Sequence, residues 1–288
     1  MRDFSGKVIV VTGAGSGIGR AAARAFSREG ARLALVDWND EALRATAASL
    51  DGETLAQGFS VAERPAWERF REAVIERFGT VDGILNNAGI AHEAVALEHV
   101  EAADFERVMD VNFRGTLHGT QVFLPDLQGR PEAFVANVSS IYGVTAVGLQ
   151  SAYCASKFAV RGLTESLRME AEAFHPNLHV ATIFPGGIAT DIARNAIAAG
   201  SRTADERETD MGEFSKNLVT TPERAAETIL KGLRKRRARI LIGTDARVMD
   251  WMARLRAAGY TRTILDQMRR KGLVGEAAPV PLRLRGDG

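Results

Sequence analysis

The stretch Lys7-Val-Ile-Val-Val-Thr12, followed by Gly13-Ala-Gly-Ser-Gly-Ile-Gly19 and then by Arg20 to Arg28, decides the fold. Its first part is a short apolar run rich in β-branched residues, which is typical of a buried strand. Its last part has apolar residues at helical spacing. A strand, a glycine-rich turn and a helix in this order predict a dinucleotide site, because glycines let the backbone approach a pyrophosphate and the helix N-terminus offers free N–H groups. No Lys-Ser/Thr pair closes the turn, which disfavours a loop for nucleoside triphosphates.

An acidic residue follows the next expected strand. Residues 31–37 form an apolar run that ends in Asp37, 18 residues after Gly19. In dinucleotide-binding folds a carboxylate about 20 residues beyond the glycines binds the adenosine ribose. This carboxylate would repel a 2′-phosphate, and the next three residues supply no cation, so we expect NAD rather than NADP. The alternative interpretation is that Asp37 caps the following helix, expected over residues 41–50.

The rest of the chain alternates short apolar runs with helical patterns. Strands are expected at residues 82–89, 133–139, 178–184 and 239–243, and helices at 102–123, 151–173 and 222–234. This alternation predicts an α/β fold, a Rossmann-like doubly wound parallel sheet of about seven strands with helices on both faces. No repeat or Pro/Ser-rich linker divides the chain. We therefore expect one catalytic domain over residues 1–243 and a C-terminal helical extension of the same domain over residues 244–288.

The composition is that of an ordinary globular protein. The 288 residues are 45% hydrophobic and 25% charged, with 28 glycines and 8 prolines. The single cysteine, Cys154, permits no intrachain disulfide and is compatible with a reducing compartment. We see no apolar leader and no run of about 18 apolar residues. From these observations we expect a cytoplasmic protein.

Charge is spread unevenly along the chain. Residues 1–230 hold 22 Lys and Arg against 31 Asp and Glu, whereas residues 231–288 hold 15 against 5. Within the basic part, a helix expected over residues 245–258 has a narrow apolar stripe made of Val248, Trp251, Met252 and Leu255. Three interpretations are open: a helix packed on its own domain or a sister subunit, a surface that contacts an anionic membrane, and recognition of an anionic substrate group. Packing is favoured, and no nucleic-acid motif accompanies the basic residues.

A second informative stretch runs from Asn137 to Lys157. Tyr153 and Lys157 are four residues apart, so on a helix their side chains lie one turn apart on the same face. An ammonium beside a phenol favours the phenolate and lowers the pKa of the phenol toward the range useful at neutral pH. Ser140 follows an expected strand, where its hydroxyl can point into the crevice that binds ligands in open α/β sheets. Taken alone, a Tyr–Lys pair at this spacing is more often a surface pair.

Six motifs in order give the chain a resemblance to a known family, the short-chain dehydrogenases/reductases. The motifs are Thr12-Gly13-x-x-x-Gly17-x-Gly19, Asn86-Asn87-Ala88-Gly89, Asn112, Ser139-Ser140, Tyr153-x-x-x-Lys157 and Pro185-Gly186. Each motif alone is weak, but six in the family's order and spacing are very specific. The resemblance covers roughly residues 4–243.

The resemblance implies a catalytic set of Asn112, Ser140, Tyr153 and Lys157. Tyr153 would be the general acid/base, and Lys157 would lower its pKa and hold the nicotinamide ribose. Ser140 would hydrogen-bond the substrate oxygen, with Ser139 in support. Asn112 would interrupt its helix and hold a water that links Lys157 to solvent.

The resemblance also implies the contacts to NAD. These are Gly13, Ser16, Gly17, Ile18, Gly19, Asp37, Asn87, Ala88, Gly89, Tyr153, Lys157, Pro185, Gly186, Ile188 and Thr190. The family often has an acid before a valine after the third strand, where this chain has Ser60-Val61. We keep both residues in the set and expect a weaker contact to adenine. No metal is expected.

The substrate is the least determined part of the site. Candidates for its wall, besides Ser140 and Tyr153, are Tyr142, Gln150 and His92, and packing within a loop is the alternative for each of the three. Residues 191–214 follow a strand end and change from small apolar to polar residues, so we expect a substrate lid, with an ordinary solvated segment as the alternative. We also expect the extension to cover part of the site's mouth, because Trp251 and Met252 come soon after the last strand.

The resemblance implies an NAD-dependent oxidoreductase that interconverts a secondary alcohol and a ketone. Two alternatives belong to other classes: a non-catalytic NAD(H)-binding sensor, and a membrane-associated scaffold that uses the basic extension. The intact proton-transfer set argues against a sensor. Homo-oligomers are usual in the family, so we expect a homodimer or homotetramer with residues 102–123 and 151–173 at the interface. The identity of the alcohol is not encoded in any of these motifs.

Overall fold

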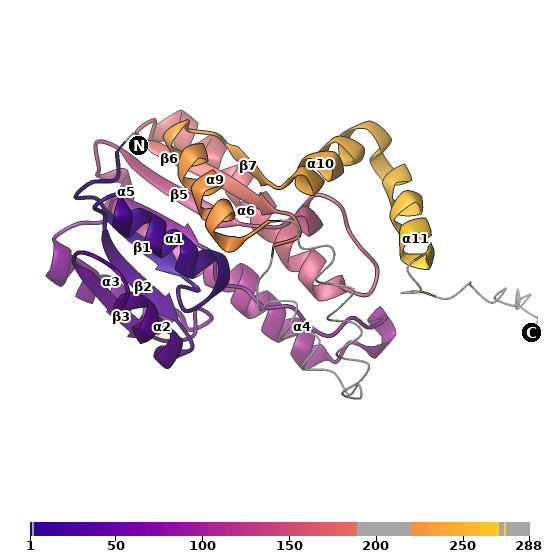
Figure 1. Cartoon of the computed structure of the whole chain (residues 1–288), viewed down its shortest axis with the longest axis horizontal. Helices are drawn as coiled ribbons and strands as arrows, with labels where there is room; N and C mark the ends of the chain where they lie inside the picture. Colours follow the sequence, from indigo (N-terminus) through magenta and orange to yellow (C-terminus); the bar gives the residue numbers. More distant parts are fainter. Residues whose placement is uncertain (2, 189–219, 271–273, 275–288) are drawn as a thin grey trace, which may run out of the picture.

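The computed structural model describes residues 1, 3–188, 220–270 and 274. Its single sheet has seven parallel strands in the order β3-β2-β1-β4-β5-β6-β7, which confirms the expected fold (Figure 1). The strands are β1 (Val8–Thr12), β2 (Arg32–Asp37), β3 (Thr54–Gly58), β4 (Gly83–Asn86), β5 (Ala133–Val138), β6 (Leu178–Pro185) and β7 (Arg239–Ile242). The strand order reverses between β1 and β4, and ligands of such sheets bind at the carboxyl ends of the strands beside this reversal.

Helices cover both faces of the sheet (Figure 1). One apolar core contains α1 (Gly17–Arg28) and α9 (Pro222–Arg234), with Leu43 of α2 (Asp40–Ala47). The other contains residues of α3 (Arg64–Phe78), α5 (Gly115–Gln128) and α6 (Ser151–Phe174). Successive residues of β1 divide between the two cores, with Val8 and Val10 in one and Ile9 and Val11 in the other. Burial on both faces is the reason that this strand is apolar throughout.

The segment expected as one helix over residues 102–123 has three parts. It begins as α4 (Ala102–Met109), passes through a π-helical turn (Asp110–Arg114) and continues as α5. Asn112 lies in this turn with its side chain fully buried. The expected single helix is therefore wrong in its middle, whereas the interruption at Asn112 is present. Single π turns within α-helices occur frequently at functional sites.

The extension forms α10 (Thr244–Arg256), a short 3₁₀ turn (Ala257–Gly259) and α11 (Tyr260–Arg270), which lie to one side of the sheet in Figure 1. The side chains of Val248, Trp251 and Leu255 are 59%, 64% and 74% exposed. Three of the four stripe residues are thus left exposed by the described part of the chain, and Met252 is half-buried. In the described residues there is no helix long and apolar enough to cross a membrane.

Two predicted features, the substrate lid and one cofactor contact, fall on residues that the structure does not describe. The lid at residues 191–214 and the cofactor contact at Thr190 lie outside the described residues. The division between residues 1–243 and 244–288 stays a prediction, as does the interface between copies. Helix α6 belongs to that expected interface, and its side chains Phe158, Met169 and Phe174 are exposed.

Candidate active site

The glycine turn between β1 and α1 packs tightly against the turn after β4. A Cβ atom on Gly19 would lie 2.0 Å from the carbonyl oxygen of Gly13, and one on Gly13 would lie 2.7 Å from Nδ2 of Asn87. Gly13 also has φ +64°, a backbone conformation that side chains rarely permit. Ser16 is exposed at the N-cap of α1 and makes no side-chain capping bond. The N-terminus of α1 fits a pyrophosphate group, because its first N–H groups receive no side-chain cap and glycines form the turn that leads into it.

Asp37 is tied to the glycine turn. Its Oδ2 accepts from the backbone N–H of Gly15 at 2.8 Å, and its Oδ1 accepts from the backbone N–H of Asn39 at 2.9 Å. The cap of α2 is Asn39, whose side chain accepts from Ala42 N. The alternative in which Asp37 caps that helix is therefore wrong. Asp37 is placed at the carboxyl end of β2, beside the turn, where a ribose-binding carboxylate belongs.

The turn after β4 is held by Thr12, the last residue of β1. The backbone N–H groups of Asn87 and Ala88 both donate to the Thr12 hydroxyl at 2.9 Å, and Nδ2 of Asn87 donates to the Thr12 carbonyl at 2.9 Å. The strand expected over 82–89 ends at Asn86, so Asn87 to Gly89 form this turn. Thr12 was not among the predicted site residues. Its place as the first residue of the glycine motif is the signal that could have identified it.

Asn112 joins three segments that are distant in sequence. Its Oδ1 accepts from Ile90 N at 2.8 Å, and its Nδ2 donates to Ile90 O and to Ser156 Oγ at 2.9 Å each. Ser156 Oγ in turn donates to the backbone carbonyl of Tyr153 at 2.8 Å. A Cβ on Gly89 would lie 3.2 Å from both Asn112 Oδ1 and Lys157 Nζ. The turn after β4, the π turn and α6 therefore meet at Gly89.

Ser140, Tyr153 and Lys157 come together at the carboxyl end of β5. Lys157 Nζ lies 5.5 Å from the centroid of the Tyr153 ring and donates to Val138 O at 3.1 Å. Ser139 Oγ donates to the backbone carbonyl of Lys157 at 2.8 Å. The Ser140 hydroxyl oxygen accepts from Tyr142 N at 3.1 Å, which leaves its own hydrogen available to another acceptor. The predicted catalytic side chains are thus gathered in one place.

The predicted direction of the Tyr153 pKa differs from what the structure shows. Burial raises the pKa of Tyr153 to about 12, and hydrogen bonding to Ser140 offsets only part of this rise. Burial also lowers the pKa of Lys157 to about 8. Removal from water disfavours the charged form of each group, and the Lys157 ammonium is turned to the Val138 carbonyl. Spacing along a helix predicted the proximity of the two residues but not the degree of their burial.

The lowered pKa of Lys157 predicts that this residue destabilises the fold at neutral pH. The pKa of Lys157 falls from 10.5 in the unfolded chain to about 8 in the folded chain. This difference corresponds to a destabilisation of the folded state by about 3 kcal/mol at neutral pH. Lys157→Met would also remove the hydrogen bond from Lys157 to Val138. That bond contributes about 1 kcal/mol to stability, so its loss offsets part of the gain. We expect Lys157→Met to raise the free energy of unfolding by about 2 kcal/mol at pH 7. Urea denaturation measures this change.

The pH dependence has a definite sign. Between about pH 8 and pH 10.5 the unfolded chain binds the Lys157 proton and the folded chain does not, so the contribution of Lys157 to wild-type stability rises with pH across this window. The advantage of Lys157→Met should therefore shrink toward pH 10.5. Lys231→Met, on the exposed surface of α9, is the matched control and should change little. A Lys157→Met variant less stable than wild type at pH 7 would contradict this account.

The predicted substrate-wall residues and the Ser60-Val61 pair have the following contacts. Tyr142 meets the Tyr153 ring edge-on, with centroids 6.2 Å apart. Gln150 Nε2 donates to the backbone carbonyl of His92 at 3.2 Å, and His92 is buried, so the loop-packing alternative is supported for this pair. Val61 is buried against Gly115, and Ser60 lies next to it with its hydroxyl accepting from Ala62 N at 3.4 Å.

The turn after β6 lies at the same edge of the sheet. Pro185 is the last residue of this strand, and Gly186 N donates to Ile242 O of β7 at 2.9 Å. Ile188 is buried and forms an isolated bridge with Thr220. Pro185 and Gly186 are therefore positioned by β6 and β7 together, and Ile188 is positioned by Thr220.

A buried asparagine network supports this edge from below and was not predicted. Asn86 Nδ2 donates to Asn137 Oδ1 at 2.8 Å and to Thr120 Oγ1 at 3.1 Å. Asn137 Nδ2 donates to Thr164 Oγ1 of α6 at 3.0 Å. The network links β4, β5, α5 and α6 one layer beneath the candidate site, so it fixes the strand ends beside that site.

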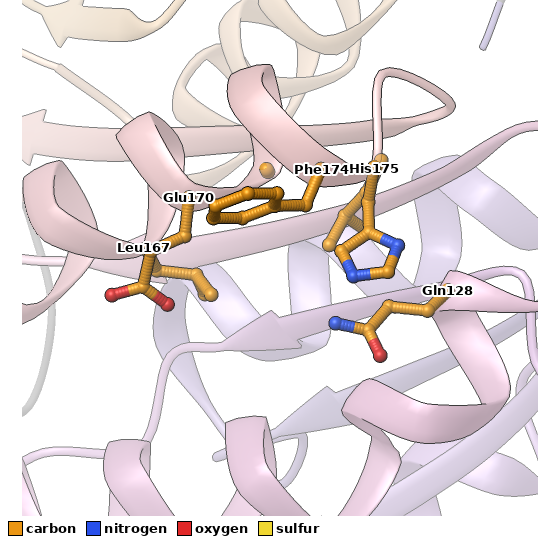
Figure 2. Close-up of a pocket in the computed structure, with 7 residues that line it drawn as sticks. Gln128, Leu167, Glu170, Phe174 and His175 are labelled. Atoms are coloured by element: carbon orange, nitrogen blue, oxygen red, sulfur yellow. The ribbon is translucent and has the colours of Figure 1, made fainter.

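A pocket shown in Figure 2 is unrelated to this site. It has a volume of about 200 Å³ and lies at the opposite edge of the sheet, where β6 begins and α5 ends. Figure 2 shows Gln128 facing Phe174 and His175, and none of the predicted site residues lines the pocket. Within the part of the chain that the structure describes, no group of three or more His, Cys, Asp or Glu side chains could hold a metal ion.

Comparison with known proteins gives a consistent result. A family model described as short chain dehydrogenase matches residues 7–200. SadH of Mycobacterium tuberculosis, which is named as an oxidoreductase, is 41% identical over 268 residues, covering 92% of this chain and 96% of that protein. Levodione reductase of Leifsonia aquatica is 35% identical over 199 residues, covering 67% and 74%. A crystal structure of a short chain dehydrogenase/reductase from Burkholderia phymatum in complex with NAD superposes with a TM-score of 0.80 at 26% identity, covering 98% of this chain and 100% of the other.

Proposed function

We propose that this chain, which belongs to the short-chain dehydrogenase family of oxidoreductases, is an NAD-dependent enzyme that interconverts a secondary alcohol and a ketone. The observation that carries the proposal is the meeting of Ser140, Tyr153 and Lys157 at the carboxyl end of β5, beside Gly89 and Asn112. A proton-transferring phenol, a neighbouring hydroxyl and a cation are the groups that a carbonyl oxygen needs when it becomes an alcohol.

The residues at the strand ends fit a nicotinamide dinucleotide, which when bound supplies or accepts the hydride. The glycine turn would hold the pyrophosphate and Asp37 the adenosine ribose, since both present polar groups beside a helix N-terminus. Lys157 and the turns at Asn87 to Gly89 and Pro185 to Ile188 would hold the nicotinamide end. The preference for NAD is supported by the carboxylate of Asp37, which would repel a 2′-phosphate.

Each reacting group has one task. With a pKa of about 12, Tyr153 keeps its proton at neutral pH, so in the resting chain its hydroxyl is ready to protonate the oxygen of a ketone. Ser140, whose oxygen already accepts from Tyr142 N, would donate its own hydrogen to the same oxygen and hold it in place. In the direction of alcohol oxidation, Tyr153 would accept the proton, and the nearby Lys157 cation would stabilise the phenolate.

The first test is a cofactor titration in which tryptophan fluorescence reports binding. Trp38 is adjacent to Asp37 and 77% exposed, so it reports binding at the adenosine end. We expect NADH to bind at least about tenfold more tightly than NADPH, a ratio that corresponds to about 1.4 kcal/mol. Asp37→Ala should narrow this ratio because it removes the charge that repels the 2′-phosphate.

Turnover is then measured by NADH oxidation on a panel of aliphatic, cyclic and steroid ketones. A preference for NADPH would overturn the assignment of Asp37. Tight NADH binding without turnover of any ketone would instead favour the non-catalytic sensor.

A further inference from the structure

The C-terminal extension reaches the candidate site through Asp245, in the first turn of α10. The backbone N–H of Gly187 donates to Asp245 Oδ2 at 2.6 Å. A Cβ on Gly186 would lie 2.2 Å from both carboxylate oxygens, and one on Gly243 would lie 2.2 Å from Oδ1. A side chain at either glycine would therefore displace the Asp245 carboxylate, and Gly243 also has φ +95°. This contact joins α10 directly to the turn after β6.

Asp245 also lies near Tyr142, the neighbour of Tyr153. Burial raises the pKa of Tyr142, and the charges of Cys154 and Asp245 raise it further. The Tyr142 ring in turn packs against the ring of Tyr153. Asp245 is thus in contact with the turn after β6 and close enough to Tyr142 for its charge to act on that hydroxyl.

Two further contacts join the extension to the loop that precedes α6. The Tyr260 hydroxyl accepts from Ala146 N at 3.2 Å. A Cβ on Gly148 would lie 3.3 Å from the Met268 Cε, so Met268 packs on this loop. We expected Trp251 and Met252 to lie at the site's mouth, but the Trp251 side chain is 64% exposed and Met252 is half-buried. Asp245, Tyr260 and Met268 make the approach instead, because α10 begins at the end of β7 with its apolar stripe turned outward.

The Asp245 carboxylate adds little to the stability of the fold. Its Oδ1 is buried and has no hydrogen-bond partner among the residues that the structure describes. A buried oxygen without a partner costs free energy. Because this cost offsets the gain from the Gly187 hydrogen bond, the main effect of the carboxylate is to fix the turn that it contacts.

We propose that Asp245 is a positioning residue, whose carboxylate holds the Gly186–Gly187 turn in the conformation that receives the nicotinamide end of the cofactor. The extension is then part of the active site and not an appendage to it. This inference rests on the proposed function for its ligand, but the contact between Asp245 and Gly187 can be tested without any ligand.

The test compares Asp245→Ala, Asp245→Asn and the control Asp266→Ala, which removes an exposed carboxylate from α11. Hydrogen exchange of the segment 184–188 is measured in the absence of cofactor, together with the melting temperature and the dissociation constant for NADH. We expect Asp245→Ala to speed exchange at Gly187 at least about tenfold and to weaken NADH binding about tenfold, because a charge-assisted hydrogen bond is lost. Its melting temperature should stay close to that of wild type.

Asp245→Asn keeps an oxygen that accepts from Gly187 N, so it should restore most of the slow exchange and most of the NADH affinity. Asp266→Ala should resemble wild type in all three measurements. Unchanged exchange at Gly187 in Asp245→Ala would overturn the proposal, as would a loss of affinity that merely follows a fall in melting temperature. Failure of the wild-type chain to bind NADH would count against the proposed function, while the exchange measurement would still decide the role of Asp245.

Discussion

Tyr153→Phe is expected to lower the rate of ketone reduction by about 10³-fold, within the range that a positioned acid or base contributes. The substitution removes the hydroxyl that holds the transferred proton and little else. The ring that packs edge-on against Tyr142 and lies beneath Lys157 Nζ is retained. NADH affinity should therefore stay within about twofold of wild type. Single-turnover oxidation of NADH with a ketone identified in the substrate panel measures the rate, and fluorescence titration measures the affinity.

Tyr142→Phe is the matched comparison, because it removes the same atom one ring away. We expect a loss of less than about tenfold, since the aromatic contact survives and the proton for the carbonyl oxygen comes from Tyr153. Equal losses in the two variants would mean that both hydroxyls take part in the reaction, which would contradict the assignment of the proton to Tyr153 alone. Near wild-type turnover in Tyr153→Phe would assign the proton to another group and overturn the proposed roles.

Gly19→Ala is expected to weaken NADH binding at least about 100-fold and to lower the free energy of unfolding by about 2 kcal/mol, as overpacking of a tight site does. The new Cβ would lie 2.0 Å from Gly13 O and 2.6 Å from Asn87 Nδ2. The first of these is a backbone atom that cannot turn aside. The glycine turn would have to open, and the N–H groups at the start of α1 would move away from the pyrophosphate position.

Gly162→Ala provides the control for the same chemical change. Gly162 lies within α6, and a Cβ there would meet nothing within 4 Å. Alanine is the better helix former, so this variant should gain about 0.5–1 kcal/mol in stability and keep its NADH affinity. Urea denaturation and NADH titration of both variants test the pair of expectations. Wild-type NADH binding by Gly19→Ala would place the cofactor elsewhere.

Much of the fold could be predicted because it depends on local patterns. The apolar run of β1 and the helical spacing of α1 are each produced by residues close together in sequence, and burial of β1 on both faces requires the run to be apolar throughout. The position of Asp37 at a strand end followed from the same reasoning. The π turn was not visible in this way, because the helical pattern of residues 102–123 continues through it. The family resemblance implied an interruption at Asn112, and the structure shows that Asn112 pairs there with Ile90, 22 residues away.

The sequence by itself determined the strand and helix order, the glycine turn, the acid at the end of β2 and the helical spacing of Tyr153 and Lys157, because each is a relation between near neighbours along the chain. The tertiary structure alone decided how far these groups are removed from water. Burial raised the pKa of Tyr153 and lowered that of Lys157, although spacing predicted a lower pKa for the tyrosine. The tertiary structure also brings Asp245 into contact with Gly187, which is 58 positions away in the sequence. Desolvation and long-range contact depend on which segments pack together, and no local pattern encodes that packing.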